Sequence, residues 1–187
     1  IELANVSFED TFSVNQNVGA VALFSEGRVN TLNDVDFGGN FVKLIVAGEG
    51  MLSIEDDLQF GFGEANIDAS NNSGGVRLKL DSQTDFGDLE EITIKGSQAR
   101  DVFDIDSAAD AGVLLNINTG TGRDTVKINE NLFAGEGSVI TGENLTVEIA
   151  ANADMREADV TGVNSFVLTG AGGLLITQAQ MEAIGAE

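Results

Sequence analysis

The sequence contains no histidine, cysteine, proline, tryptophan or tyrosine. Without histidine and cysteine, the chain cannot build a Cys/His zinc site, a thiol nucleophile or a Ser-His-Asp triad, so any bound metal must have oxygen ligands. Basic residues are also scarce, with 9 Lys and Arg against 31 Asp and Glu and a formal net charge of −22. Because phosphate binding needs clustered basic side chains and these are scattered along the chain, nucleic acid is not an expected partner.

Long apolar runs are missing as well. No stretch approaches the roughly 18 apolar residues of a membrane span, and the first residues lack the regions of a signal peptide. We therefore expect a soluble protein without membrane insertion, whose start at Ile1 suggests a processed chain or a piece of a longer one. The 42% hydrophobic content is enough for one ordinary core, which predicts a single folded domain over residues 1–187.

Apolar residues recur mostly at every second position, in short runs rich in Val, Ile, Leu and Phe, which is typical of β-strands. The clearest runs are residues 41–46, 76–80, 92–94, 102–105, 115–117, 125–128 and 145–149. Helix signals are confined to the end of the chain, where Thr177 and Gln180 fit a capping box and Gly185 is the expected stop. The sequence thus predicts an all-β fold with one short C-terminal helix.

Internal repetition indicates how the strands connect. Residues 92–105 align without a gap on residues 115–128, so apolar and turn positions coincide at an offset of 23 residues. Units of about twenty residues with elastic turns are typical of stacked solenoid coils. The sequence also lacks the Asn-Gly and Asp-Gly pairs that favour tight hairpins. We predict a right-handed parallel β-helix or β-roll, with an antiparallel β-sandwich as the alternative.

Within this domain we expect an N-terminal strand segment over residues 1–30, solenoid coils over residues 31–176 and a helical cap over residues 177–187. The open ends of a solenoid carry unpaired strand groups, so the first segment either adds to a neighbouring copy or is the first strand of its own domain. Its candidate assembly residues, which share one apolar face, are Val6, Phe8, Phe12 and Val14.

One turn region carries a recognisable motif, whose matching residues are Gly120, Gly122, Asp124 and Val126. It resembles the calcium-binding nonapeptide Gly-Gly-x-Gly-x-Asp-x-apolar-x of the repeats-in-toxin family, with Thr119 in place of the first glycine. A poorer copy, without the turn glycines, contains Asp101. The resemblance implies calcium between successive turns, held by carboxylates and turn carbonyls. The candidate ligands are Asp101, Asp104, Asp106, Gly120, Gly122 and Asp124. The alternative is that the Asp side chains cap their own turns.

The Gly-, Asn-, Asp- and Thr-rich turns, the lack of cysteine and residues 174–181 are similar to segments of bacterial surface-layer and adhesin proteins related to the repeats-in-toxin group. The resemblance implies an extracellular or cell-surface location and assembly of β-solenoid domains into layers or filaments, often with calcium. We therefore expect a non-enzymatic structural protein whose partners are copies of itself. The alternative is a monomeric carbohydrate-binding or adhesive module that recognises a cell-surface glycan.

Enzymatic activity is not expected. A glycoside hydrolase needs two carboxylates at a set separation, and a lyase needs a base such as Arg or Lys beside a bound metal. The sequence supplies acidic residues throughout and singles out none of them for such a role. The absence of Trp and Tyr also removes side chains that commonly stack on sugars.

Overall fold

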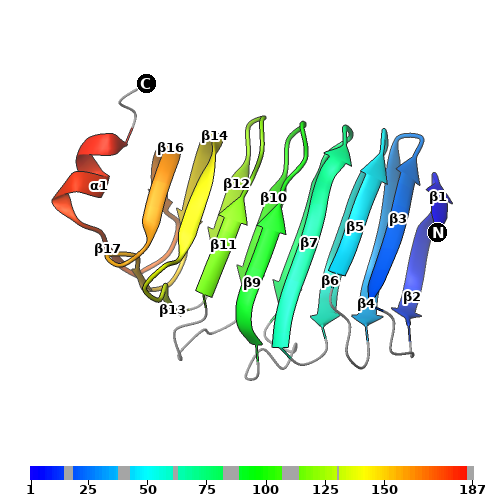
Figure 1. The fold of residues 1–187 in the computed structure, drawn as a ribbon, viewed down its shortest axis with the longest axis horizontal. Helices are drawn as coiled ribbons and strands as arrows, with labels where there is room; N and C mark the ends of the chain where they lie inside the picture. The colour runs from blue at the N-terminus through cyan, green and yellow to red at the C-terminus, as the bar shows by residue number, and fades with distance from the viewer. Residues whose placement is uncertain are drawn as a thin grey trace.

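The structure is a computed structural model that describes residues 1–14, 19–37, 43–60, 63–81, 89–106, 114–129 and 131–184. The predicted β-solenoid is confirmed, because successive strands stack beside one another along one axis of the molecule (Figure 1). Every pairing between described strands is parallel, which excludes the antiparallel sandwich.

The strands lie on two faces of the solenoid, and the strands of each face pair with one another in order. The two faces belong to a single sheet because β14 joins them. The first face contains β1 (Glu2–Ala4), β3 (Ala20–Glu26), β5 (Lys43–Gly48), β7 (Gly63–Asn72), β9 (Leu89–Lys95) and β11 (Leu114–Asn118). The second face contains β2 (Ser7–Ser13), β4 (Val29–Phe37), β6 (Met51–Phe60), β8 (Val76–Asp81), β10 (Val102–Asp106) and β12 (Thr125–Ile128).

The two faces meet at β14 (Val139–Ile149), whose first half pairs with β11 and whose second half pairs with β12. Strand β16 (Asp159–Leu168) continues the sheet beyond β14. The last coils also have a small second sheet, which consists of β13 (Leu132–Phe133), β15 (Ala153–Asp154) and β17 (Leu174–Leu175).

The internal repeat corresponds to one turn of the solenoid. Strands β9 and β11 pair with Ile92 opposite Leu115, and β10 and β12 pair with Phe103 opposite Val126. This is the 23-residue alignment read from the sequence. Because the offset equals one coil, equivalent side chains lie directly above one another in adjacent strands.

The core includes two long ladders of inward side chains, since alternate residues of each strand face the interior. The ladder of the first face, from β3 to β16, is Val21, Leu44, Ile67, Ile94, Ile117, Ile140 and Val160. The ladder of the second face is Phe8, Leu32, Ile54, Leu78, Phe103, Val126, Val147 and Phe166. Between the two ends of the molecule these side chains are buried, so each coil supplies apolar area to its neighbours.

The C-terminal end is covered in part by α1 (Gln178–Ala183). The predicted capping box is confirmed: Thr177 Oγ1 accepts the Gln180 N–H at 3.2 Å, and Gln180 Oε1 accepts the Thr177 N–H at 2.7 Å. Gln180 Nε2 also donates to the carbonyls of Met155 and Ala158, which fixes the helix against the last coils. The expected stop at Gly185 lies outside the described residues.

Residues 1–30 belong to the same sheet as the predicted coils. Strand β1 pairs with β3 and β2 pairs with β4, both in parallel, within the chain itself. The described solenoid therefore extends over both predicted ranges. In the described part of the chain, no helix has the length and hydropathy needed to cross a membrane.

Candidate functional site

Short turns join the two faces along one edge of the solenoid, at the top of Figure 1. The turns before β10 and β12 contain the residues that resemble the calcium motif. Polar side chains are buried along this edge, and they are Ser25, Asn30, Asn72, Ser97, Asp101, Thr119 and Asp124. Buried polar groups at regular coil spacing need hydrogen-bond partners, so their contacts decide what the edge can do.

Asp101 is fully buried, and both of its carboxylate oxygens accept hydrogen bonds. Oδ1 accepts the Val76 N–H at 2.8 Å and the Ser97 hydroxyl at 2.6 Å, while Oδ2 accepts the Ser97 N–H at 2.5 Å. Burial raises the pKa of Asp101 to about 6, even though these donors favour the charged form, and the nearby Asp124 carboxylate adds to the increase. The side chain thus caps its own turn through Ser97 and ties it to the preceding coil through Val76.

Asp124 repeats part of this arrangement one coil later. Its Oδ1 accepts the Asp101 N–H at 2.9 Å, but its Oδ2 and the Thr119 hydroxyl are buried without a hydrogen-bond partner among the described residues. Burial raises the pKa of Asp124, against the opposing effects of the Asp101 N–H and of the Thr119 hydroxyl, which lies nearby without forming a hydrogen bond of standard geometry. Asp101 and Asp124 therefore form a stacked pair.

Asn30 has the same position in an earlier coil, which the sequence did not single out. Its Oδ1 accepts the Val6 N–H at 2.9 Å, and its Nδ2 donates to Ser25 Oγ at 2.7 Å. An amide thus performs the inter-coil contact that a carboxylate performs at Asp101. Asn30 pairs with Leu52 and Leu52 with Val76, whose N–H donates to Asp101, so the two polar residues lie in one column of the second face. Their equivalence could not be read from the sequence, because Asn30 lies outside the gapless repeat.

Two of the other predicted calcium ligands, Asp104 and Asp106, lie within β10 and away from this pair. Asp104 lies opposite Lys79 and Lys127 in adjacent strands of the second face, and the Asn129 amide donates to it. Asp106 is the last residue of β10, where it pairs with Asp81, and its side chain lies outside the described part. In the described ranges, no group of three Asp or Glu side chains is placed to hold a metal ion. Calcium binding stays a prediction from the resemblance.

The two turn glycines have a steric role in stacking. Gly120 has φ of 82° and Gly122 has φ of 146°, a region that residues with a side chain rarely adopt. A Cβ at Gly120 would lie 2.2 Å from Ser97 O, and a Cβ at Gly122 would lie 2.3 Å from Ala99 O. Both glycines are therefore needed for the close approach of one turn to the preceding turn.

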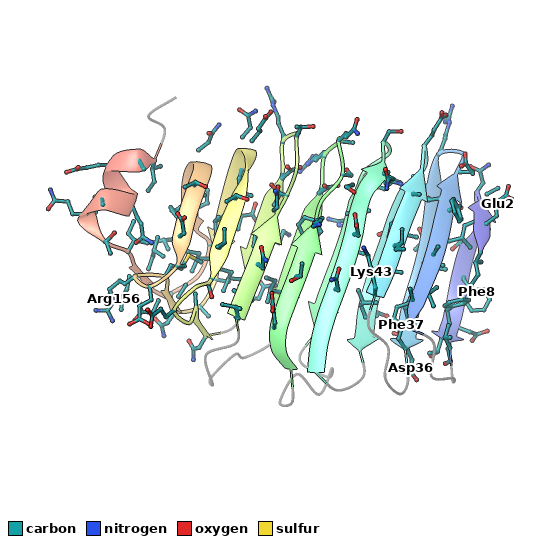
Figure 2. The ribbon with its side chains drawn as sticks, in the orientation of Figure 1. Glu2, Phe8, Asp36, Phe37, Lys43 and Arg156 are labelled. Carbon is teal, nitrogen blue, oxygen red and sulfur yellow. The ribbon has the colours of Figure 1, made fainter. Side chains whose placement is uncertain are left out.

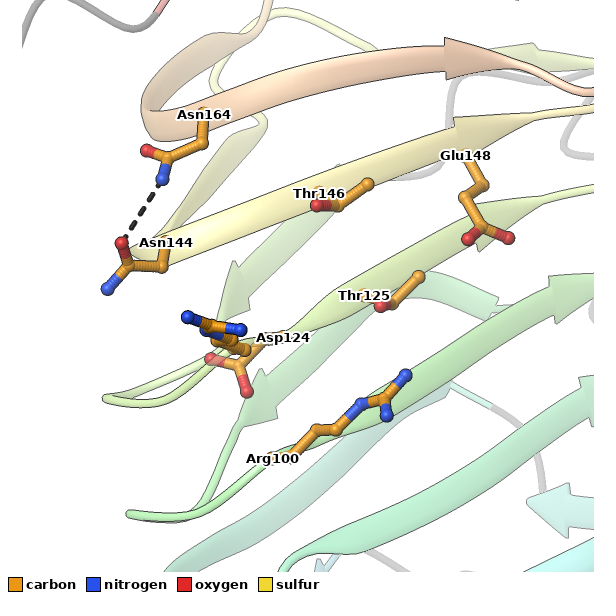
Figure 3. A pocket seen from close by; sticks show the side chains of 8 residues that line it. Arg100, Asp124, Thr125, Asn144, Thr146, Glu148 and Asn164 are labelled. Carbon is orange, nitrogen blue, oxygen red and sulfur yellow. Dashed lines mark hydrogen bonds between the residues drawn. The ribbon is translucent and has the colours of Figure 1, made fainter.

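A polar groove of about 560 Å³ opens beside this edge, on the outer surface of the second face (Figure 3). Its lining residues are all polar or charged, and they are Arg100, Arg123, Asp124, Thr125, Asn144, Thr146, Glu148 and Asn164. Asn164 Nδ2 donates to Asn144 Oδ1 at 3.1 Å across one wall. No pattern in the sequence indicates this groove, because its residues are up to 64 positions apart and meet only through the coil stacking.

The candidate assembly residues lie at the N-terminal end of the solenoid (Figure 2). Val6, Phe12 and Val14 are partly buried against the core, whereas Phe8 is 41% exposed. Phe8 pairs in register with Leu32, which is only 2% exposed, so Phe8 occupies a core position in the first described coil. The structure therefore brings the four residues to one end of the solenoid. They lie in or beside β2, which pairs with β4 of the same chain.

No family model matches the sequence, and neither a curated protein nor a solved structure is significantly similar to it.

Proposed function

We propose that this chain is a non-enzymatic structural protein that associates with copies of itself through its N-terminal coil, at a cell surface or in an extracellular matrix. The observation that carries this proposal is the exposure of Phe8. It is in register with the buried second-face ladder, yet 41% of its surface is open to solvent. Full burial of an exposed Phe side chain contributes about 1.5–3 kcal/mol, so covering the 41% that remains exposed contributes roughly 0.6–1.2 kcal/mol, and a second coil stacked on this end would be stabilising.

The backbone at the same end supports the proposal. Strands β1 and β2 are the two end strands of the main sheet, and each pairs with another described strand on one side only. A free edge of this kind is a template for pairing with another strand. Apolar side chains and unpaired backbone groups thus coincide at one surface.

The opposite end differs because α1 and its Gln180 contacts cover part of it. Leu168 of β16 nevertheless remains 56% exposed, although it pairs in register with the fully buried Ile149. Two geometries follow from these ends. Contact of two N-terminal ends gives a closed dimer, and contact of an N-terminal end with a C-terminal end gives an open filament.

An extracellular setting fits the charge of the molecule. Copies that each carry a net charge of −22 repel one another, and divalent cations such as calcium reduce this repulsion. This part of the proposal rests on the resemblance to surface-layer and adhesin proteins and on the charge, not on a metal site.

Sedimentation velocity of the purified chain, in calcium and then in excess chelator, tests the proposal. We expect association in calcium, and we expect Phe8→Glu to shift the species towards monomer because it places a charge in the buried contact. Leu168→Glu distinguishes the filament from the dimer. It should disrupt a filament, which uses both ends, and leave a dimer of two N-terminal ends intact.

The matched control is Phe24→Glu. Phe24 is 47% exposed and also lies near the N-terminal end, but it faces outward from β3, whereas Phe8 is in register with the inward ladder. Normal association of Phe24→Glu together with monomeric Phe8→Glu supports the N-terminal contact. A wild-type chain that is monomeric at all accessible concentrations, or a Phe8→Glu chain that associates normally, contradicts it.

A further inference from the structure

We propose that the polar groove beside β12 and β14 binds an oligosaccharide that carries carboxylates. The first observation is the placement of Arg100 and Arg123, which line the groove and are exposed. Neither guanidinium forms an ion pair with any described residue. In a chain with 31 acidic and 9 basic residues, two neighbouring arginines without acidic partners are unexpected.

The spacing of the two arginines suits a linear ligand with repeated negative groups. Arg100 and Arg123 immediately precede the stacked residues Asp101 and Asp124, so they occupy equivalent positions in adjacent coils. Neighbouring strands of a sheet lie about 4.8 Å apart, which sets the separation of the two side-chain origins. Each guanidinium can hold a carboxylate through two parallel hydrogen bonds.

The walls of the groove suit the hydroxyl groups of a sugar. Figure 3 shows Thr125 and Thr146 on neighbouring strands, with Asn144 on the same strand as Thr146 and Asn164 on the next strand. These hydroxyls and amides can both donate and accept hydrogen bonds. The described lining contains no apolar side chain, so the groove offers little to a hydrophobic ligand.

The two acidic lining residues do not cancel the arginines. Asp124 is 1% exposed and its Oδ2 is buried, so its carboxylate faces the interior of the turn. The Glu148 carboxylate lies 3.9 Å from Lys127 Nζ on the adjacent strand, which offsets its charge. The surface presented to a ligand is therefore positive at the arginines and neutral along the walls.

An acidic segment of a protein is the competing ligand, because it also carries carboxylates. The groove favours the saccharide because four neutral hydroxyl and amide side chains surround the arginines, which matches a ligand with many hydroxyls between its charges. The net charge of −22 opposes any polyanion at long range, but this repulsion is screened beyond about 8 Å at physiological ionic strength.

Nuclear magnetic resonance titration of the arginine Nε–H groups tests the inference directly. The probe is a short uronic-acid oligosaccharide, compared with the same oligosaccharide after reduction of its carboxylates to alcohols and with an oligo-aspartate peptide. We expect the uronic-acid chain to shift Arg100 and Arg123 and to bind more tightly than both comparison ligands. Arg100→Gln and Arg123→Gln should each weaken its binding about tenfold, because each removes a charge-assisted hydrogen bond.

The matched control is Arg28→Gln. Arg28 is an exposed arginine in the equivalent turn of an earlier coil, outside the groove, so its loss should leave binding unchanged. Equal binding of the reduced oligosaccharide, tighter binding of oligo-aspartate, absence of binding, or full binding by the Arg100→Gln variant would each overturn the inference. The monomeric Phe8→Glu variant should retain the site, so failure of self-association and failure of this inference can be told apart.

Discussion

At the scale of single residues, the stacked Asp101 and Asp124 show how a metal-like motif can serve the fold. Asp101 accepts three hydrogen bonds from Val76 and Ser97, and its own N–H donates to Asp124. Carboxylates with this many donors need no cation to satisfy them. The alternative considered from the sequence, that these acids cap turns, therefore describes Asp101 well.

The pKa of Asp101 predicts a pH dependence of stability. Burial raises this pKa from 3.8 to about 6, so the folded state holds the proton more tightly than the unfolded state. The resulting contribution to the free energy of unfolding is fully present below pH 3.8 and is lost as the pH rises through about 6. It amounts to about 3 kcal/mol at about 1.4 kcal/mol per pKa unit. Urea unfolding at a series of pH values should show this decline, and Asp101→Asn should remove most of it.

High salt is needed in this experiment, because protonation of surface acids stabilises the fold in the same direction. Asp159→Asn, a change at an exposed position of β16, is the matched control and should keep the wild-type slope. An unchanged slope in Asp101→Asn would contradict the assignment.

At the scale of the strands, the outer surface of the second face carries charges of alternating sign. Lys79, Asp104, Lys127 and Glu148 occupy successive strands in register. Opposite charges on adjacent strands attract one another, and each such pair contributes about 0.2–1 kcal/mol. If adjacent coils carried the same charge at this position, parallel in-register stacking would place like charges next to one another. The alternation of sign avoids this repulsion.

Reversal of one charge tests this arrangement. Lys127→Glu places a carboxylate between Asp104 and Glu148, and we expect it to lower the free energy of unfolding by about 1 kcal/mol through like-charge repulsion. Lys127→Gln should have a smaller effect, since it removes attraction without adding repulsion. Urea unfolding at low and high salt measures both, and the Lys127→Glu loss should shrink as salt increases. A loss that does not depend on salt would point to packing instead of charge.

At the scale of the whole molecule, the dominant property is the net charge of −22. Self-repulsion destabilises a compact state, and mobile cations reduce it. We expect calcium and magnesium at equal concentration to raise the thermal midpoint by similar amounts. The reason is that the described residues include no group of three acidic side chains for a dedicated ion, and both Asp101 oxygens already accept hydrogen bonds.

Differential scanning calorimetry in each chloride salt, and in sodium chloride at matched ionic strength, makes this comparison. An increment specific to calcium that disappears in Asp124→Asn would instead support the site implied by the repeats-in-toxin resemblance.

Local patterns in the sequence determined the fold class. Alternating apolar residues predicted the strands, and the gapless repeat predicted stacked parallel coils. The observed pairing of Ile92 with Leu115 has the same 23-residue offset as that repeat. Thr177 and Gln180 predicted the helix cap. These features could be read because strand periodicity, coil length and capping each depend on residues that are close together in the sequence, or that repeat at a constant offset.

Tertiary structure alone decided where the ends and the groove lie. Strand β14 begins at Val139, earlier than the apolar run at 145–149 indicated, and it links the two faces. Its pairing with β16 shifts register between Thr141 and Leu145, a change that no periodic pattern specifies. Arg100 and Asn164 reach one groove only because of this stacking, and Phe8 is exposed only because no described coil covers it. The repeating coil follows from local sequence patterns, whereas the surfaces depend on how turns of unequal length position each coil on the next.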